Sequence, residues 1–147
     1  MKNILLIEDD PIKLSAIRDF IINTFNFNVD TKMSYQSGLK TILERKYELV
    51  LLDMQLPNYD IKSGEDGYKQ RPLAGRDILR EIKRKKIQSR VVIITQYDSF
   101  GEDGKFVSWQ EWDTFFSEQF KSIYYSTIFY NPASSSWKEQ LKLFFAS

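Results

Sequence analysis

The stretch YELVLLDMQLPN, residues 47–58, decides the fold. Its centre is a continuous apolar run that ends in one carboxylate, Asp53, and Pro57 follows four residues later. Strands that are covered on both faces read as continuous apolar runs, and such strands belong to parallel sheets. The stretch therefore predicts a buried parallel strand over 48–53 that presents an acid at its carboxyl end.

Short apolar runs alternate with helical patterns along the whole chain. The predicted strands span 3–7, 27–33, 48–53, 90–95 and 126–130, and the predicted helices span 10–25, 34–46, 75–86, 106–120 and 135–145. Asp10 is a candidate N-cap of the first helix, and Pro11 occupies its first position. The apolar face of that helix is predicted to comprise Ile12, Ala16, Ile17, Phe20 and Ile21. Five strand–helix repeats predict an α/β fold, a doubly wound five-stranded parallel sheet with helices on both faces.

Composition narrows the chemistry that the chain can carry out. With 147 residues, one domain is the default. The 21 basic and 20 acidic residues leave a net charge of +1, so the molecule as a whole has no electrostatic field that would attract it to nucleic acid. Cysteine and histidine are both absent, so oxygen ligands remain, and these suit Mg²⁺ or Ca²⁺. The N-terminal apolar run is too short for a signal peptide, and no segment has the length of a membrane span. We expect a cytoplasmic protein with no membrane partner.

Polar side chains gather at the predicted strand ends. Glu8 and Asp9 follow the first strand, Asp53 the third, and Thr95 ends the fourth. In doubly wound sheets, ligands bind beyond the carboxyl ends of the strands. Clustered carboxylates repel one another unless a cation joins them, so the cluster predicts Mg²⁺. A carboxylate such as Asp53 can form an aspartyl phosphate, with the Thr95 hydroxyl donating to a phosphoryl oxygen.

These motifs resemble the receiver domain of two-component response regulators. The matching stretches are ILLIEDDP (4–11), LVLLDMQLP (49–57), GRDILREIK (75–83), VVIITQYD (91–98) and the Asn-Pro step at 131–132. The resemblance spans essentially the whole chain, 1–147. It implies a flavodoxin-like receiver fold with strand order 2-1-3-4-5, and a phosphoacceptor signalling domain in place of an enzyme.

The resemblance also implies a role for each matching residue. Asp53 would be the phosphoacceptor and Thr95 the switch hydroxyl. Asp9, Asp53 and the backbone carbonyl of Gln55 would bind Mg²⁺, with Glu8 assisting through a water molecule. The phosphoryl donor would be a histidine of a sensor kinase or a phosphotransfer protein.

Three positions depart from the family pattern. Asn131 stands where receivers place a lysine, and an amide has no charge, so phosphoryl stabilisation should be weaker unless another cation reaches the site. Gln96 replaces the usual small residue after the switch threonine, and Ile128 replaces the usual aromatic residue. The resemblance further implies a cis peptide before Pro132.

Two segments are longer than the family pattern requires. Residues 58–74 read as an irregular insertion, which we interpret as a lid or a partner surface. The aromatic residues within 106–120 fall at helical spacing, which indicates that they pack in the core. The alternative is an exposed docking stripe formed by Trp109, Trp112 and Phe116. The resemblance implies signalling to a downstream protein through the fourth helix, fifth strand and fifth helix, and a homodimer through this face stays open.

Two functions remain from the sequence. The first is a stand-alone receiver that accepts a phosphoryl group on Asp53 with Mg²⁺ and signals by protein contact. The alternative is a pseudo-receiver that binds partners without phosphorylation, motivated by Asn131 and Gln96. An aspartyl-phosphate hydrolase is disfavoured because Gln55 stands where those enzymes place a second acid.

Overall fold

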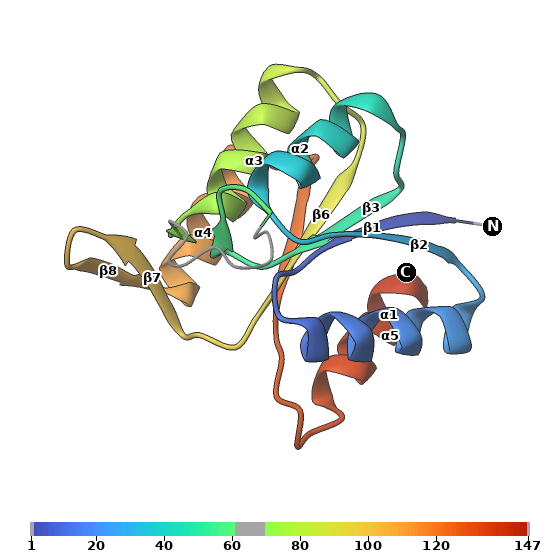
Figure 1. Ribbon diagram of the computed structural model, residues 1–147. Coiled ribbons are helices and arrows are strands. Elements are labelled where there is room, and N and C mark those ends of the chain that lie inside the picture. Colours follow the sequence, from blue (N-terminus) through green and yellow to red (C-terminus); the bar gives the residue numbers. More distant parts are fainter. Residues whose placement is uncertain (1, 61–69, 147) are drawn as a thin grey trace.

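A single parallel sheet organises the chain, whose computed structural model describes residues 2–60 and 70–146 (Figure 1). Its strands are, in spatial order, β2 (Asn28–Lys32), β1 (Asn3–Ile7), β3 (Leu49–Leu52), β6 (Arg90–Thr95) and β9 (Tyr124–Phe129). All neighbours pair in parallel. Because β6 and β9 are the fourth and fifth strands of this sheet, the predicted order 2-1-3-4-5 is confirmed, although β9 begins two residues earlier than predicted.

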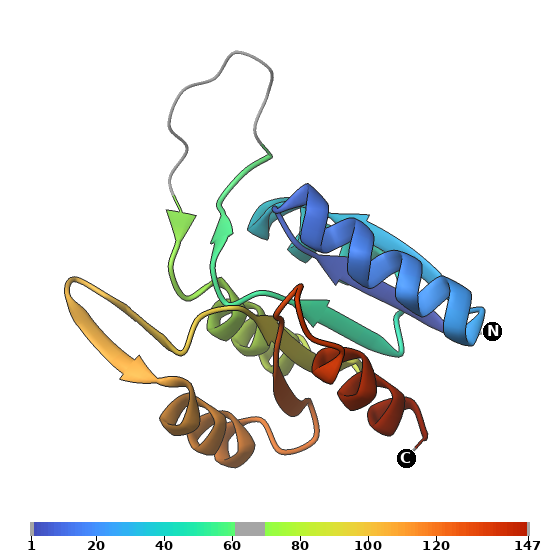
Figure 2. The same ribbon diagram turned by 90° about the horizontal axis from the view of Figure 1, so that it is seen from below.

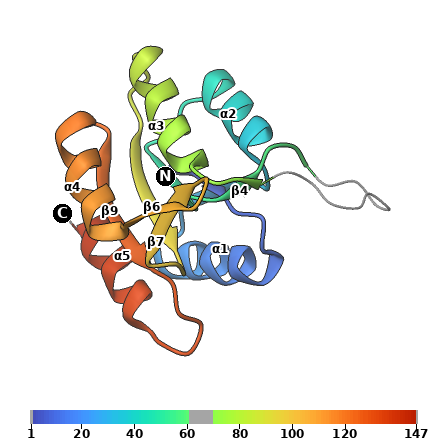
Figure 3. The same ribbon diagram turned by 90° about the vertical axis from the view of Figure 1, so that its left-hand side faces the viewer.

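Helices cover both faces of the sheet (Figures 1 and 3). They are α1 (Pro11–Phe25), α2 (Tyr35–Glu44), α3 (Ala74–Arg84), α4 (Trp109–Gln119) and α5 (Ser136–Ala146). Leu6 and Leu51 of the sheet pack with α1 and α5 in one core. Leu52 packs on the other face with α2, α3 and α4. Alternate residues of each central strand therefore enter different cores, which explains the continuous apolar runs.

The first helix begins as predicted. The Asp10 side chain accepts hydrogen bonds from the backbone N–H groups of Ile12 (2.9 Å) and Lys13 (3.4 Å), and Pro11 follows as the first helical residue. The predicted apolar face is wrong at one position, because Ile12 is 79% exposed and Lys13 is only 1% exposed. The face toward the sheet instead repeats every four residues, through Lys13, Ile17 and Ile21.

The predicted helix over 106–120 is wrong in its first turn. An antiparallel hairpin of β7 (Ser99–Glu102) and β8 (Lys105–Ser108) precedes α4 and projects from the body beside it (Figure 2). Its two-residue turn, Asp103-Gly104, has positive φ at both residues (57° and 76°), as the commonest hairpin turns require. The Asp103-Gly104 pair is the feature of the sequence that predicts this hairpin turn. Phe106 consequently lies on the hairpin and is 61% exposed.

The aromatic residues of α4 are mainly core residues. Phe116 is fully buried, and Trp109 and Trp112 pack against the same core while remaining partly exposed. Trp112 also donates a hydrogen bond from its indole nitrogen to the carbonyl of Phe100 at 3.1 Å, which ties α4 to the hairpin. The core interpretation is thus confirmed for Phe116.

The predicted insertion over 58–74 is described only at its two ends, because residues 61–69 lie outside the described residues. β4 (Leu56–Pro57) and β5 (Gln70–Arg71) pair antiparallel. Arg71 contacts Asp77 (3.0 Å) and Asn58 (3.1 Å), and its guanidinium stacks 3.8 Å from the centre of the Tyr35 ring. These contacts fix both ends of the segment to α2 and α3.

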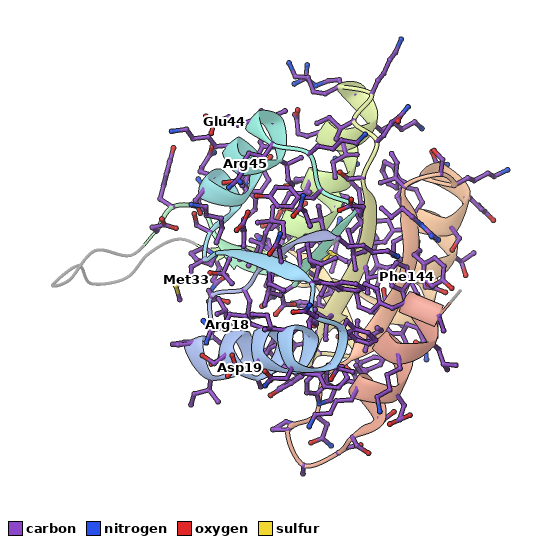
Figure 4. The ribbon with its side chains drawn as sticks, turned by 90° about the vertical axis from the view of Figure 1, so that its right-hand side faces the viewer. Arg18, Asp19, Met33, Glu44, Arg45 and Phe144 are labelled. Carbon is purple, nitrogen blue, oxygen red and sulfur yellow. The ribbon has the colours of Figure 1, made fainter. Side chains whose placement is uncertain are left out.

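The edge strand β2 is joined to α2 by an ion pair. Arg45, directly after α2, lies 3.2 Å from Asp30 of β2, and Met33 lies just beyond the end of that strand (Figure 4).

Two further expectations concern the chain as a whole. Among the described residues, no helix has the length and apolar character that a membrane-spanning helix requires. The expected cis peptide before Pro132 is wrong, since the chain has only trans peptides in its described part.

Candidate functional site

Buried polar residues meet where three parallel strands end. Glu8 follows β1 and is 1% exposed, Asp53 follows β3 and is 5% exposed, and Thr95 ends β6 with no exposed surface. The strands pair in register just before these residues, so the three positions share one edge of the sheet. The structure therefore places Glu8, Asp53 and Thr95 at the edge where the sequence pattern predicts polar side chains.

Lys13 joins the cluster from α1, and sequence reasoning missed it. Its ammonium lies 2.7 Å from Oε1 of Glu8 and 3.1 Å from Oδ2 of Asp53. It also donates a hydrogen bond to the carbonyl of Ile94 at 3.0 Å. A protonated lysine has three N–H donors, and three acceptors surround this one. The two acids are therefore held together by an internal cation.

A signal for Lys13 was present in the sequence. It lies four residues before Ile17 and eight before Ile21, on the face of α1 that packs on the sheet. Lysine is almost never fully buried unless it is paired. A lysine in a buried stripe next to several acids therefore indicates an ion pair in the interior.

Burial and charge act in opposite directions on these groups. Burial raises the pKa of Glu8, and the Lys13 ammonium partly opposes this shift. Burial also raises the pKa of Asp9, and the nearby charge of Asp53 adds to it. Burial alone would lower the pKa of Lys13, but Asp53 and Glu8 outweigh it and raise that pKa, so the side chain stays an ammonium ion.

The backbone fixes the second oxygen of the Asp53 carboxylate. Oδ1 accepts a hydrogen bond from the Met54 N–H at 2.7 Å, while Oδ2 faces Lys13. The Met54 carbonyl in turn accepts a hydrogen bond from Gly75 N–H at 3.0 Å, at the start of α3. Asp53 is thus held in one orientation from both sides. Gln55 lies two residues on, half-buried between β3 and β4.

Thr95 lies on the neighbouring strand and is anchored to the next one. Its hydroxyl oxygen accepts a hydrogen bond from the Tyr97 N–H at 3.2 Å, and its carbonyl accepts one from the Tyr130 N–H at 2.8 Å. Gln96, the departure that follows it, is exposed and lines a surface hollow with Tyr130 and Asn131. The hollow borders the site on the β9 side.

Asn131, at the position of the family lysine, lies in the turn after β9. Its side chain is exposed, and Oδ1 accepts a hydrogen bond from the Ala133 N–H at 2.9 Å. The residue before it, Tyr130, is buried and places its ring 5.8 Å from the Lys13 ammonium. The residue directly after β9 therefore contributes an aromatic face to the cation of the site, a favourable electrostatic contact.

The donor chemistry of the site fits Mg²⁺. Glu8, Asp9, Asp53 and the Gln55 carbonyl would offer the hard oxygen ligands that this ion prefers. Oε1 of Glu8 is buried without a geometrically good hydrogen bond, although Lys13 lies 2.7 Å away. Within the described residues, no three acidic side chains lie together as a ready metal cluster. Lys13 stands between two of the candidate ligands.

The order of the sheet, with acids and a threonine at its carboxyl edge, defines a doubly wound α/β domain of the flavodoxin-like type. The chain belongs to the response regulator receiver domain family, whose model matches residues 4–108. Members of this family are signalling domains of two-component systems, typically bind Mg²⁺, and interact with histidine kinases or phosphotransfer proteins.

Known proteins resemble the chain over nearly its full length. The Detocs response regulatory protein DtcB of Enterobacter cloacae is 29% identical and aligns over 93% of this chain and 94% of its own. A CheY-like receiver from Methanospirillum hungatei is 17% identical with a TM-score of 0.66, covering 99% of this chain and 92% of that one. The regulator TrrA of Thermotoga maritima, solved with Mg²⁺-BeF, is 18% identical with a TM-score of 0.61, covering 97% and 98%.

Proposed function

We propose that the chain is a receiver that accepts a phosphoryl group on Asp53 from the phosphohistidine of a sensor kinase or phosphotransfer protein. The observation that carries the proposal is the setting of Asp53. One carboxylate oxygen is fixed by the Met54 N–H, the other faces the Lys13 ammonium, and the Thr95 hydroxyl lies on the next strand. A single acid that is oriented in this way is suited to act as a nucleophile.

In the proposed reaction, a carboxylate oxygen of Asp53 attacks the phosphorus of the donor. The new O–P bond forms as the P–N bond of the phosphohistidine breaks, and the electron pair leaves on the imidazole nitrogen. The Thr95 hydroxyl donates a hydrogen bond to a phosphoryl oxygen. Glu8, Asp9, Asp53 and the Gln55 carbonyl would hold Mg²⁺, which when bound neutralises the charge of the transferring group.

The test is labelling with a small phosphodonor. The protein is incubated with acetyl phosphate and Mg²⁺, and its intact mass is measured. We expect one phosphoryl adduct on the wild type and none on Asp53→Asn. The matched control is Asp19→Asn, which removes an exposed acid from the outer face of α1 (Figure 4) and should leave the adduct unchanged. An adduct on Asp53→Asn, or none on the wild type, would contradict the proposal.

A pseudo-receiver is the second candidate, and one observation favours it. The Lys13 ammonium contacts both Glu8 and Asp53, so a cation is already in contact with two of the proposed metal ligands. A chain of this kind would bind partners in one fixed state. The absence of an adduct, with unchanged partner binding in Asp53→Asn, would support this candidate.

For the output we propose the face formed by α4, β9 and α5. The Tyr124 hydroxyl of β9 donates a hydrogen bond to Asp113 of α4 at 2.5 Å. Tyr130, directly after β9, donates its N–H to the Thr95 carbonyl, so β9 and the residue that follows it connect the site to α4. Tyr125 on the same strand is 41% exposed. A downstream protein or a second copy of the chain would dock there. Light-scattering mass with and without acetyl phosphate distinguishes the homodimer.

A further inference from the structure

We propose that the Lys13 ammonium is the cationic partner of the phosphoryl group on Asp53, taking the role that the family gives to a lysine at position 131. The inference rests on the proposed function and adds a catalytic residue to it. Sequence comparison at position 131 alone suggests a weakened receiver. In the structure, the positive charge comes instead from Lys13 of α1.

The contacts of Lys13 are the first support. Its ammonium is 3.1 Å from the acceptor carboxylate, and it is held there by Glu8 and by the Ile94 carbonyl. Among the residues that the structure describes, Lys13 is the basic side chain that pairs with Asp53. A phosphoryl group added to Asp53 would place its new negative charge next to this cation, where charge-assisted hydrogen bonds are strongest.

The cost of burying Lys13 is the second support. The residue is on the same face of α1 as Ile17 and Ile21, where an aliphatic side chain would pack without desolvating a charge. Replacing a buried ion pair by apolar residues of similar volume is often neutral or stabilising. Stability alone therefore gives little reason for the buried group of Lys13, Glu8 and Asp53 as a whole, although removing only Lys13 would leave two buried acids unpaired. Buried charges arranged around an acid are instead typical of functional sites.

The end of β9 is the third support. Asn131 is exposed and its oxygen is engaged in its own turn, so it offers no charge to the site. Tyr130 turns inward instead, packs on Trp137 with ring centres 5.2 Å apart, and faces Lys13. The strand that carries the lysine in other receivers here supports a lysine that comes from α1.

Lys13 acts without gaining or losing a proton. As the O–P bond to Asp53 forms and the donor P–N or P–O bond breaks, the ammonium shifts its hydrogen bonds from the carboxylate toward a phosphoryl oxygen. The leaving electron pair stays on the donor's imidazole or acetate. Lys13 therefore stabilises the charge of the transferred group and remains protonated throughout.

The test combines labelling with Mg²⁺ binding in the full chain. Four proteins are compared with the wild type: Lys13→Met, Asn131→Lys, the double variant with both changes, and Ile12→Met as a neighbouring exposed control. With acetyl phosphate and Mg²⁺, Lys13→Met should be labelled more slowly by roughly tenfold or more. The double variant should recover part of this loss, and Asn131→Lys and Ile12→Met should label at close to the wild-type rate.

Titration with Mg²⁺ alone, followed by tryptophan fluorescence, gives a second readout. Without the ammonium, Glu8 and Asp53 are free for the metal, so Lys13→Met should bind Mg²⁺ more tightly than the wild type. Slower labelling together with tighter Mg²⁺ binding would support the proposal. If Lys13→Met does not fold, Lys13→Gln keeps N–H donors without the charge, and the same pair of results is expected.

Several results would overturn the inference while the proposed function stands. These results are a Lys13→Met variant that is labelled as fast as the wild type, one that is labelled faster, or one that loses both labelling and Mg²⁺ binding. Equal labelling of the wild type with EDTA and with Mg²⁺ would contradict the proposed part of Mg²⁺ and would overturn the inference too, because Lys13 would then act in the place of the metal. An adduct that appears only in Asn131→Lys would overturn the inference and favour the pseudo-receiver. No adduct on any protein would reject the proposed function and the inference together.

Discussion

The first turn of α1 and the turn after β9 both reach the carboxyl edge of the sheet, but they differ in what they bring there. α1 brings Lys13, a buried ammonium between two acids. The β9 turn brings an exposed amide, Asn131, and a buried ring, Tyr130. In this chain, the positive charge of the site is therefore supplied by α1 and the aromatic support by the turn after β9.

This difference shows that the position of a functional group in space need not follow its position in a family pattern. Comparing position 131 alone predicts a site without a cation. The structure has one, because the face of α1 that meets the sheet begins only two residues after Pro11, close to the acids. The sites of related proteins are thus better compared by where their charged groups lie in space than by which residue stands at each aligned position.

The largest expected effect comes from removing the α1 charge. Lys13→Met leaves Glu8 and Asp53 buried without their partner, which should reduce the free energy of unfolding by about 3 kcal/mol, measured by urea denaturation in EDTA. Ile12→Met, at the exposed neighbour, should change it by less than about 0.5 kcal/mol. Mg²⁺ should restore more stability to Lys13→Met than to the wild type. A variant as stable as the wild type in EDTA would show that the acids need no partner.

Next in size is the loss of the ring on the β9 side. Tyr130→Leu removes the contacts with Trp137 and Lys13 and should destabilise the protein by about 2 kcal/mol, from lost packing and the cation–π contact. Tyr130→Phe keeps the ring and serves as the control. The same urea series measures both. If the two variants are equally stable, the ring does not support Lys13.

A smaller effect is expected at Asn131. Asn131→Ala removes the hydrogen bond from the Ala133 N–H and should cost roughly 1 kcal/mol or less, because the group is exposed to water. Phosphoryl labelling should keep its wild-type rate. A clear loss of labelling would mean that this amide does serve the site, and the comparison between the two turns would fail.

The smallest effect is confined to alkaline pH. Burial raises the pKa of Tyr130 above its ordinary value of 10.0, although Lys13 opposes the shift. The folded state therefore holds this proton more tightly than the unfolded state, and the resulting stability is present below pH 10 and is lost as the pH rises through the folded pKa. Tyr130→Phe should lose less stability over this range in urea melts at pH 9 and above. Parallel losses in both proteins would contradict this assignment.

Much of the fold could be predicted from the sequence, and the failures have physical reasons. Continuous apolar strands such as 48–53 identify a parallel sheet, and Asp10-Pro11 marks the start of α1. The hairpin before α4 was missed because Phe106 matched a helical spacing, although Asp103-Gly104 is a strong turn signal.

At the site, the acids and Thr95 could be predicted because parallel strands end at the same edge. Lys13 could not be predicted from residue type alone, since lysine is normally exposed and its burial depends on acids that are distant in sequence. Asp53, for instance, is 40 residues away. The helical stripe signals that Lys13 is buried near acids, but its pairing with Asp53 is identified only once α1 is placed on the sheet.

The most direct test of the central claim observes the lysine itself. In protein with ¹⁵N-labelled lysine, the side-chain resonance of Lys13 can be assigned by its absence in Lys13→Met and followed as acetyl phosphate and Mg²⁺ are added. We predict a protonated, slowly exchanging ammonium whose resonance shifts as the wild type is labelled and does not shift in Asp53→Asn. An unchanged Lys13 resonance in fully phosphorylated wild type would contradict the claim that this residue binds the phosphoryl group.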